Sequence, residues 1–349
     1  MGSEMCIRDS YGVVKGCDAH IRFTFITGVS KFTKVSLFSG LNSLKDITLD
    51  PSYSAICGYT EADLDEVFAP ELPGLDRDKI RHWYNGYRWR GAESVYNPID
   101  ILLLFGEREF KAHWIETGTP GFLPDLLVRR GVSGLDLERM SGTEQLLSNF
   151  DVGEIGTEAL LFQTGHLTVT GEEALGGKPL YRLGYPNREV KQSLNEWLLD
   201  RMMEDPSERT RNLRDLERVM RTGDPGKLKR VFDLILGGIP HQWHSSGELK
   251  KYEAYYTTAV YSHFAAQGMN PRAEDSGSRG RADMTVQFEG SVYLFEFKVA
   301  VPAGTALRQI KAKGYATKYL GASLRVWLVG VEVDGKSREV QRFDTERVQ

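Results

Sequence analysis

The chain has the length and composition of a globular protein with more than one domain. It contains 349 residues, of which 41% are hydrophobic and 26% charged, and its formal net charge is -4. No run approaches the roughly 20 apolar residues of a membrane-spanning helix, and the start has no secretory signal pattern. The three cysteines have neither disulfide nor metal-ligand spacing. We therefore expect two or three domains in a cytoplasmic protein without a membrane association.

The beginning of the chain does not fit a natural start. Residues 1–10 (MGSEMCIRDS) have no periodic pattern and resemble a translated sequencing-adapter end. We interpret them as a non-native tail and expect the natural protein to extend further upstream. Residues 20–28 are an apolar run ending at a glycine, which predicts a buried strand of a parallel sheet.

Residues 60–105 contain helix signals and many aromatic residues. Thr60 precedes acidic residues and an apolar stripe, which predicts a helix with Thr60 as its N-cap. Asn85 and Gly86 predict a turn packed by neighbouring Trp and Tyr residues, and Pro98 predicts the start of another helix. A surface on which nucleic-acid bases stack is the alternative for these aromatic residues, although their spacing does not favour it.

From about residue 100 to 240 the pattern is mainly helical. Residues 160–169 interrupt it as a helix end followed by a strand, and Asn187 predicts the cap of a further helix. Residues 237–247 are rich in Gly, Pro, His and Ser, which predicts a linker. His241 and His244 fall in this segment, where we expect surface residues rather than zinc ligands.

The last hundred residues predict a small mixed α/β domain. Its elements in order are a helix over 248–266, a hairpin of two strands, a helix beginning near Thr305, and a strand that is turned back at Asp334 and Gly335. Tyr315 and Tyr319, four residues apart on the second helix, are expected to serve packing. Arg279 and Arg281 are either loop charges or phosphate contacts.

The hairpin brings two carboxylates together. If Glu289 and Gly290 form a two-residue loop, pairing begins between Phe288 and Ser291 and places Asp283 opposite Glu296. Directly opposed like charges destabilise a sheet, so this arrangement requires a cation between them. Carboxylate oxygens are ligands for Mg²⁺ or Mn²⁺, and we predict a divalent metal held by these two residues.

Alternation along the strands predicts the surroundings of this pair. Lys298 lies two residues beyond Glu296 and therefore on the same face, together with Arg281. The other face is apolar and predicts a core surface: Met284, Val286 and Phe288 opposite Tyr293, Phe295, Phe297 and Val299. A metal with a nearby lysine suits phosphodiester hydrolysis, and Glu253 on the preceding helix could add a carboxylate or a proton-transfer group.

These residues resemble the PD-(D/E)XK nuclease superfamily. The resemblance rests on Asp283 and the Glu296 to Lys298 segment after an apolar strand, and on residues 309–319 (QIKAKGYATKY), which are similar to the following helix in one branch of the superfamily. That branch fuses the nuclease-like domain to an AAA-ATPase-like domain. Four amino-terminal segments resemble it too: residues 25–32 (FITGVSKF), 49–60 (LDPSYSAICGYT), 83–87 (WYNGY) and 181–189 (YRLGYPNRE).

The resemblance implies three parts and a set of functional residues. Residues 11–240 would be a truncated AAA-ATPase-like domain, the end of a P-loop fold with a mainly helical middle region, and residues 245–349 a restriction-endonuclease-like domain of mixed α/β structure. Asp283 and Glu296 would be metal ligands and Lys298 the catalytic lysine. Glu253 would be the helix-borne acidic residue and Gln309 a polar partner near the site. The cofactor would be Mg²⁺ or Mn²⁺, and the partner DNA or RNA.

The chain departs from this branch in lacking a phosphate-binding loop. No GxxxxGK[ST] motif occurs, and residues 176–178 (GGK) lack its first glycine and its hydroxyl residue. ATP is therefore expected only for the full-length family and not for this chain, although Thr27 could be either a strand end or a γ-phosphate-sensing residue. The main expectation is a metal-dependent nuclease. The alternative is a regulator that binds nucleic acid or protein without cutting.

Overall fold

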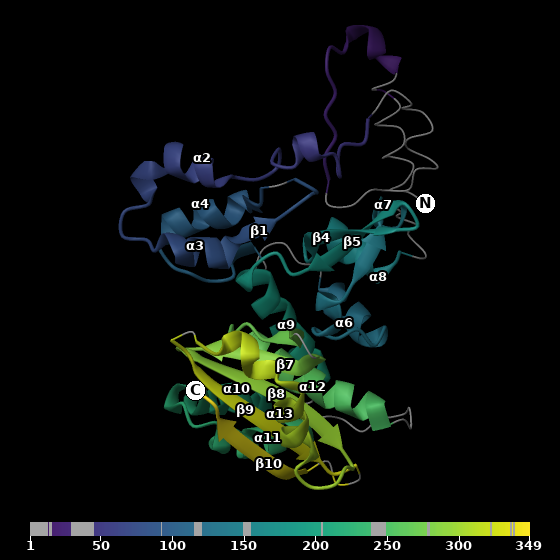
Figure 1. The fold of residues 1–349 in the computed structure, drawn as a ribbon. Helices are drawn as coiled ribbons and strands as arrows, with labels where there is room; N and C mark the ends of the chain where they lie inside the picture. Colours follow the sequence, from purple (N-terminus) through teal and green to yellow (C-terminus); the bar gives the residue numbers. More distant parts are fainter. Residues whose placement is uncertain are drawn as a thin grey trace. The chain divides into compact units, whose positions relative to one another are not determined.

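The computed structural model divides the chain into two compact units (Figure 1). One unit comprises Met1–Thr117 and Arg139–Asn187, and the other Gly118–Glu138 and Arg188–Gln349. None of the helices in the described part of the chain is long and apolar enough to cross a membrane. The structure describes residue 13 and residues 16–28, 45–91, 93–114, 121–148, 155–203, 205–238, 249–277, 280–321, 323–335, 337 and 339–349. The expected tail at residues 1–10 lies outside these ranges.

The amino-terminal unit combines short helices with two small sheets. Strands β1 and β2 pair with each other, and β3, β5 and β4 form a second sheet in that order. The predicted helix end and strand within residues 160–169 are confirmed by the end of α8 and the start of β4, whereas β3 and β5 depart from the mainly helical pattern predicted after residue 100. The elements are η1 (Asp18–His20), η3 (Pro51–Tyr53), α2 (Glu61–Glu66), η4 (Ala69–Glu71), α3 (Arg77–Tyr84), β1 (Asn85–Tyr87), β2 (Val95–Tyr96), α4 (Pro98–Glu107), β3 (Ser141–Thr143), α7 (Glu144–Ser148), α8 (Thr157–Gln163), β4 (Thr168–Leu175) and β5 (Lys178–Gly184).

Some local predictions for this unit are confirmed and others are wrong. The Thr60 side chain accepts from the backbone of Asp63, whose carboxylate in turn accepts from the Thr60 backbone, and α4 begins at Pro98. In contrast, residues 21–28 form no strand, and Phe23 is 80% exposed. No strand among the described residues pairs with this segment. An apolar sequence pattern is buried only when a neighbouring element covers it.

Asn85 and Gly86 lie in strand β1 instead of the predicted turn. Gly86 has a φ of +131°, and a Cβ there would lie 1.8 Å from the carbonyl oxygen of Pro186. Only glycine permits this close approach. The contact between Gly86 and Pro186 joins residues 83–87 and 181–189, two of the segments on which the AAA-ATPase-like resemblance rests. The rings of Trp83, Tyr84 and Tyr87 are buried, which favours packing over base stacking.

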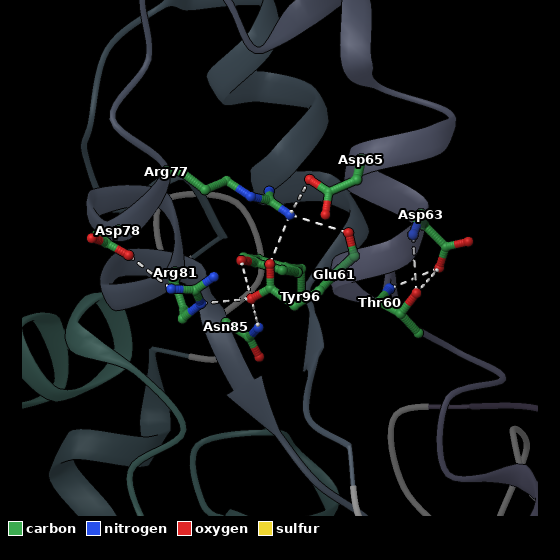
Figure 2. A network of polar contacts seen from close by, with 9 residues as sticks. All are labelled: Thr60, Glu61, Asp63, Asp65, Arg77, Asp78, Arg81, Asn85 and Tyr96. Carbon is green, nitrogen blue, oxygen red and sulfur yellow. Dashed lines mark hydrogen bonds and ion pairs between the residues drawn. The ribbon is translucent and has the colours of Figure 1, made fainter.

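Glu61, in the first turn of α2, links α2 to α3, β1 and β2 (Figure 2). Its Oε1 accepts hydrogen bonds from Arg81 Nε at 2.8 Å, Asn85 Nδ2 at 3.1 Å and the Tyr96 hydroxyl at 2.8 Å. Its Oε2 accepts from Arg77 Nη2 at 2.7 Å. Burial by itself would raise the pKa of Glu61, but Arg81, Tyr96 and Arg77 lower it below its ordinary value. The carboxylate is thus ionised at neutral pH.

Removing this negative charge is expected to loosen the amino-terminal unit. Glu61→Gln keeps the shape but weakens the charged hydrogen bonds, which are worth roughly 1.5 to 3 kcal/mol each when buried and less at this partly exposed site. We expect a loss of about 1 to 2 kcal/mol, measured as faster amide hydrogen exchange in α3, β1 and β2. Asp78→Asn is the matched control, because Asp78 binds Arg81 while its side chain is 90% exposed. Equal exchange in the two variants would contradict the prediction.

The carboxy-terminal unit is a helix–sheet–helix sandwich. Its sheet has the strand order β10-β9-β8-β7-β6, in which β8 and β9 are parallel and the other neighbours antiparallel. The strands are β6 (Arg272–Gly277), β7 (Gly280–Phe288), β8 (Ser291–Val299), β9 (Arg325–Val333) and β10 (Val340–Arg347). The helices are α6 (Phe122–Arg129), η5 (Asp136–Glu138), α9 (Arg188–Met202), α10 (Pro206–Thr222), η6 (Pro225–Lys227), α11 (Leu228–Gly237), α12 (Leu249–Ala266), α13 (Thr305–Lys313) and η8 (Tyr315–Tyr319).

Each face of this sheet packs against its own helices. Helices α10, α11 and α12 cover one face, and α13 and η8 cover the other. The first face contains the predicted core residues Met284, Val286, Tyr293, Phe295, Phe297 and Val299, packed against Phe232 and Phe264. Each such buried side chain contributes roughly 1.5 to 3 kcal/mol of transfer free energy. This dense layer supports the polar residues on the opposite face from behind.

The compact units do not divide where the sequence suggested a boundary. Residues 188–237 form α9, α10, η6 and α11, and they belong to the same compact unit as the carboxy-terminal sheet. Lys191 of α9, for example, binds Glu138 at 2.6 Å and the Pro271 carbonyl at 2.5 Å. The structural division at Asn187 and Arg188 therefore precedes the predicted division between residues 240 and 245. The predicted linker lies mostly outside the described residues.

Candidate functional site

A tight turn sets the register of the predicted site. Glu289 and Gly290 have φ values of 44° and 72°, as in a two-residue hairpin loop. Pairing begins between Phe288 and Ser291 and continues to Met284 and Phe295. The predicted register is confirmed over these pairs.

The strands change their relation at Asp283. Instead of a further ladder bond, Asp283 Oδ2 accepts a hydrogen bond from the Phe297 backbone N–H at 2.8 Å. Ala282 packs with Val292 and Leu294 in the apolar cluster under α13, rather than with Met284. Strict alternation was therefore wrong beyond Asp283. Its carboxylate replaces a backbone acceptor, which fixes it beside β8.

Glu296 is the buried centre of the site, with a side chain only 1% exposed. Its Oε1 lies 2.9 Å from Lys298 Nζ and accepts a hydrogen bond from Gln309 Nε2. Its Oε2 is buried and has no hydrogen-bond partner within the described residues. Burial, together with the charge of Asp283, raises the pKa of Glu296 to about 7. The site thus holds a carboxylate with one oxygen available to a further ligand.

Lys298 lies among acceptors on this face. Its Nζ is 2.9 Å from Glu296 Oε1, 3.4 Å from Glu253 Oε2 and 2.9 Å from the Phe297 carbonyl oxygen. Burial would lower the pKa of Lys298, but the charges of Glu296, Asp283 and Glu253 outweigh it and raise the pKa above its ordinary value. The ammonium therefore remains charged at neutral pH.

The two residues expected from flanking helices reach the same place. Glu253 of α12 accepts a hydrogen bond from the backbone N–H of Val299 through Oε1, at 3.3 Å, and contacts Lys298 through Oε2. Gln309 of α13 bonds Glu296 and also the hydroxyl of Tyr315. The structure thus brings together all five predicted residues, Glu253, Asp283, Glu296, Lys298 and Gln309. Their roles stay predictions.

Tyr315 is the residue that sequence reasoning assigned to packing alone. It is 5% exposed, and burial raises the pKa of its hydroxyl. The chain reaches this position because α13 ends at Lys313 and Gly314, with a φ of 61°, redirects it into η8. No periodic pattern in the sequence predicts that Tyr315 lies next to Gln309, since Tyr315 lies beyond the helix that carries Gln309.

The donor set fits a magnesium-type ion. Glu296 Oε2 is a buried oxygen with no hydrogen-bond partner in the part of the chain that the structure describes, and Asp283 is the carboxylate whose charge acts on Glu296 most strongly. Among the described residues, no group of three or more His, Cys, Asp or Glu side chains is arranged to hold a metal. Two carboxylates with several waters are nevertheless usual for Mg²⁺. His241, His244 and Arg279 lie outside the described residues, and Thr27 is exposed.

Comparison with known proteins finds a family match for the carboxy-terminal part of the chain. Residues 251–343 match the family model described as "PD-(D/E)XK nuclease superfamily". A curated protein of Azotobacter chroococcum mcd 1, described as "Uncharacterized protein in vnfD 5'region", is 54% identical over 342 residues. The alignment covers 97% of this chain and 66% of that protein, so the chain spans less than two thirds of its relative. No solved structure matches. The carboxy-terminal part of this chain, residues 251–343, is accordingly a domain of the PD-(D/E)XK nuclease superfamily.

Proposed function

We propose that the carboxy-terminal domain is a metal-dependent nuclease that hydrolyses phosphodiester bonds of DNA or RNA. The observation that carries this proposal is the buried Glu296 carboxylate beside Asp283. Its Oε1 is bound by Lys298 and Gln309, whereas its Oε2 has no partner among the residues that the structure describes. Lys298 already pairs with Oε1, but a buried carboxylate oxygen without a partner is costly, and a metal ion bound at Oε2 would remove that cost. The superfamily match supports the same assignment.

The residues divide the work of hydrolysis between them. Asp283 and Glu296 would hold Mg²⁺ or Mn²⁺, which when bound activates water and neutralises charge on the phosphate. The Lys298 ammonium stabilises negative charge that develops on the phosphoryl oxygens. Glu253 holds Lys298 in place through a contact of 3.4 Å, and Gln309 fixes the rotation of the Glu296 carboxylate. Each group is therefore oriented before substrate binds.

We further propose that the amino-terminal unit is the end of an AAA-ATPase-like domain. Support comes from the resemblance of residues 83–87 and 181–189 and from the close packing of these two segments at Gly86. Nucleotide binding is proposed only for the longer proteins of this kind, because this chain contains no GxxxxGK[ST] motif. Activity of the nuclease-like domain in this chain would therefore not depend on ATP.

A cleavage assay with one matched pair of variants tests the nuclease proposal. The purified chain is incubated with single-stranded and double-stranded DNA and RNA in Mg²⁺, Mn²⁺ or EDTA. We expect metal-dependent cleavage, reduced roughly 100-fold or more in Asp283→Asn. Asp344→Asn in β10 serves as the control, because Asp344 belongs to a partly exposed pair with Arg342. Cleavage that survives Asp283→Asn unchanged, or is absent with every substrate, refutes the proposal. Binding without cleavage would favour the non-cutting regulator.

A further inference from the structure

Helix α13, which carries Gln309, is capped by a residue from another element. Its own N-cap, Gly304, has a φ of 77° and offers no side-chain hydrogen bond. Glu332 of β9 caps the helix instead. Its Oε2 accepts a hydrogen bond from the Gly304 N–H and its Oε1 accepts one from the Ala306 N–H, each at 2.9 Å. Glu332 is only 5% exposed. Its charge also complements the positive end of the helix dipole.

A glycine on the same strand lets α13 approach closely. A Cβ on Gly330 would lie 2.6 Å from the backbone nitrogen of Leu307 and 3.1 Å from its Cα. A side chain there would therefore push the first turn of α13 away from the sheet. Gly330 is the direct neighbour of Glu296 in the parallel ladder, and Glu332 is the neighbour of Lys298. The docking points of α13 are thus adjacent to the residues of the proposed site.

We infer that Glu332 is a positioning residue of the metal site, acting through α13. Together with Gly330 it fixes the first turn of α13, so that Gln309, one turn further along, holds Oε1 of Glu296 and leaves Oε2 turned toward a divalent cation. This inference rests on the proposed function. Groups that orient a metal ligand typically change metal affinity or activity 10- to 100-fold when removed.

Mn²⁺ binding to the full chain, measured by electron paramagnetic resonance without nucleic acid, tests this inference. We expect roughly 10-fold weaker binding in Glu332→Gln. Gly330→Ala changes no charge and is expected to weaken Mn²⁺ binding too. This variant therefore distinguishes an effect of the position of α13 from an effect of the lost charge of Glu332. Asp205→Ala is the control: Asp205 caps α10 at the Ser207 N–H, so the variant loses a helix cap away from the site and should keep wild-type Mn²⁺ affinity.

A double variant shows whether Glu332 acts through Gln309. Gln309→Ala alone is expected to weaken Mn²⁺ binding, and adding Glu332→Gln should cause little further loss, because residues that act as one unit are not additive. Circular dichroism verifies folding, and if Glu332→Gln does not fold, Gly330→Ala and Gln309→Ala decide. The inference would be overturned if the folded variants kept wild-type Mn²⁺ affinity, or if Asp205→Ala lost as much affinity as they do. It would also be overturned if the losses in the double variant were fully additive, or if the wild type bound no Mn²⁺. Weaker Mn²⁺ binding in the variants without cleavage by the wild type would leave it standing and refute only the nuclease activity.

Discussion

Replacing Lys298 with alanine is expected to reduce nucleic-acid cleavage by a factor of about 100 to 1,000, the usual effect of removing one preorganised group that stabilises transition-state charge. The ammonium lies 2.9 Å from Glu296 Oε1 and is held charged by three carboxylates. The loss should appear in the single-turnover rate at saturating metal, since the lysine is proposed to act on the substrate phosphate and not on the ion. Removing a cation beside two carboxylates should leave Mn²⁺ affinity equal or higher.

The lysine prediction has a control on the neighbouring helix. Lys311 of α13 forms an exposed ion pair with Glu346 at 2.9 Å, so Lys311→Ala removes the same charge without entering the site. We expect it to cleave at the wild-type rate in moderate salt. If Lys298→Ala cleaves as fast as Lys311→Ala while both are folded, Lys298 has no catalytic role. A parallel loss of Mn²⁺ affinity would instead make Lys298 part of the support of the metal site.

Glu296→Gln is expected to remove both metal binding and one pH dependence of stability. The pKa of Glu296 is raised from 4.5 to about 7 by burial and by Asp283, so the metal-free fold prefers its protonated form. That stabilisation is complete below about pH 4.5 and is lost as the pH rises through about 7. At 1.4 kcal/mol per pKa unit it amounts to at most roughly 3 to 4 kcal/mol. Glutamine imitates the protonated form, so the variant should not show this loss.

Urea unfolding in EDTA between about pH 5 and about pH 8 measures this effect as the difference between wild type and Glu296→Gln. The difference is needed because buried His166 and His263, whose pKa values burial lowers to about 4, give the opposite slope, with stability lost as the pH falls below about 6.5. At about pH 8, Mg²⁺ should stabilise the wild type and not the variant. Glu346→Gln, on the exposed edge strand, is the control. A difference that does not change with pH would contradict the prediction.

The hairpin was predictable from the sequence because its determinants are local. A two-residue loop at Glu289 and Gly290 and the period of two are enough to bring Glu296 and Lys298 to one face beside Asp283. Glu253 could be named from the sequence only as a carboxylate on the preceding helix, and Gln309 only from the family resemblance, since their contacts join α12 and α13 to β8. The change of alternation at Asp283 could not be predicted, because it depends on a side chain that replaces a ladder bond.

Other features depend on contacts between distant segments. Glu332 caps α13 although it lies 28 residues after Gly304, the N-cap residue of that helix. No local capping pattern predicts a partner so distant in the sequence. Residues 21–28 show the opposite case, in which an apolar pattern predicts a strand but Phe23 and Phe25 stay exposed. A local sequence pattern indicates which element a segment can form, but tertiary contacts determine whether the element forms.

The composition of β10 bears on how copies of this protein meet. As the outermost strand next to β9, it presents backbone groups that could pair with a second sheet. Its pairing with β9 is irregular between Val340 and Arg342, and the strand carries charges of both signs at Arg342, Asp344, Glu346 and Arg347. A distorted, charged edge disfavours strand addition from another molecule. The sheet that holds Asp283 and Glu296 is thereby protected from edge-to-edge aggregation on this side.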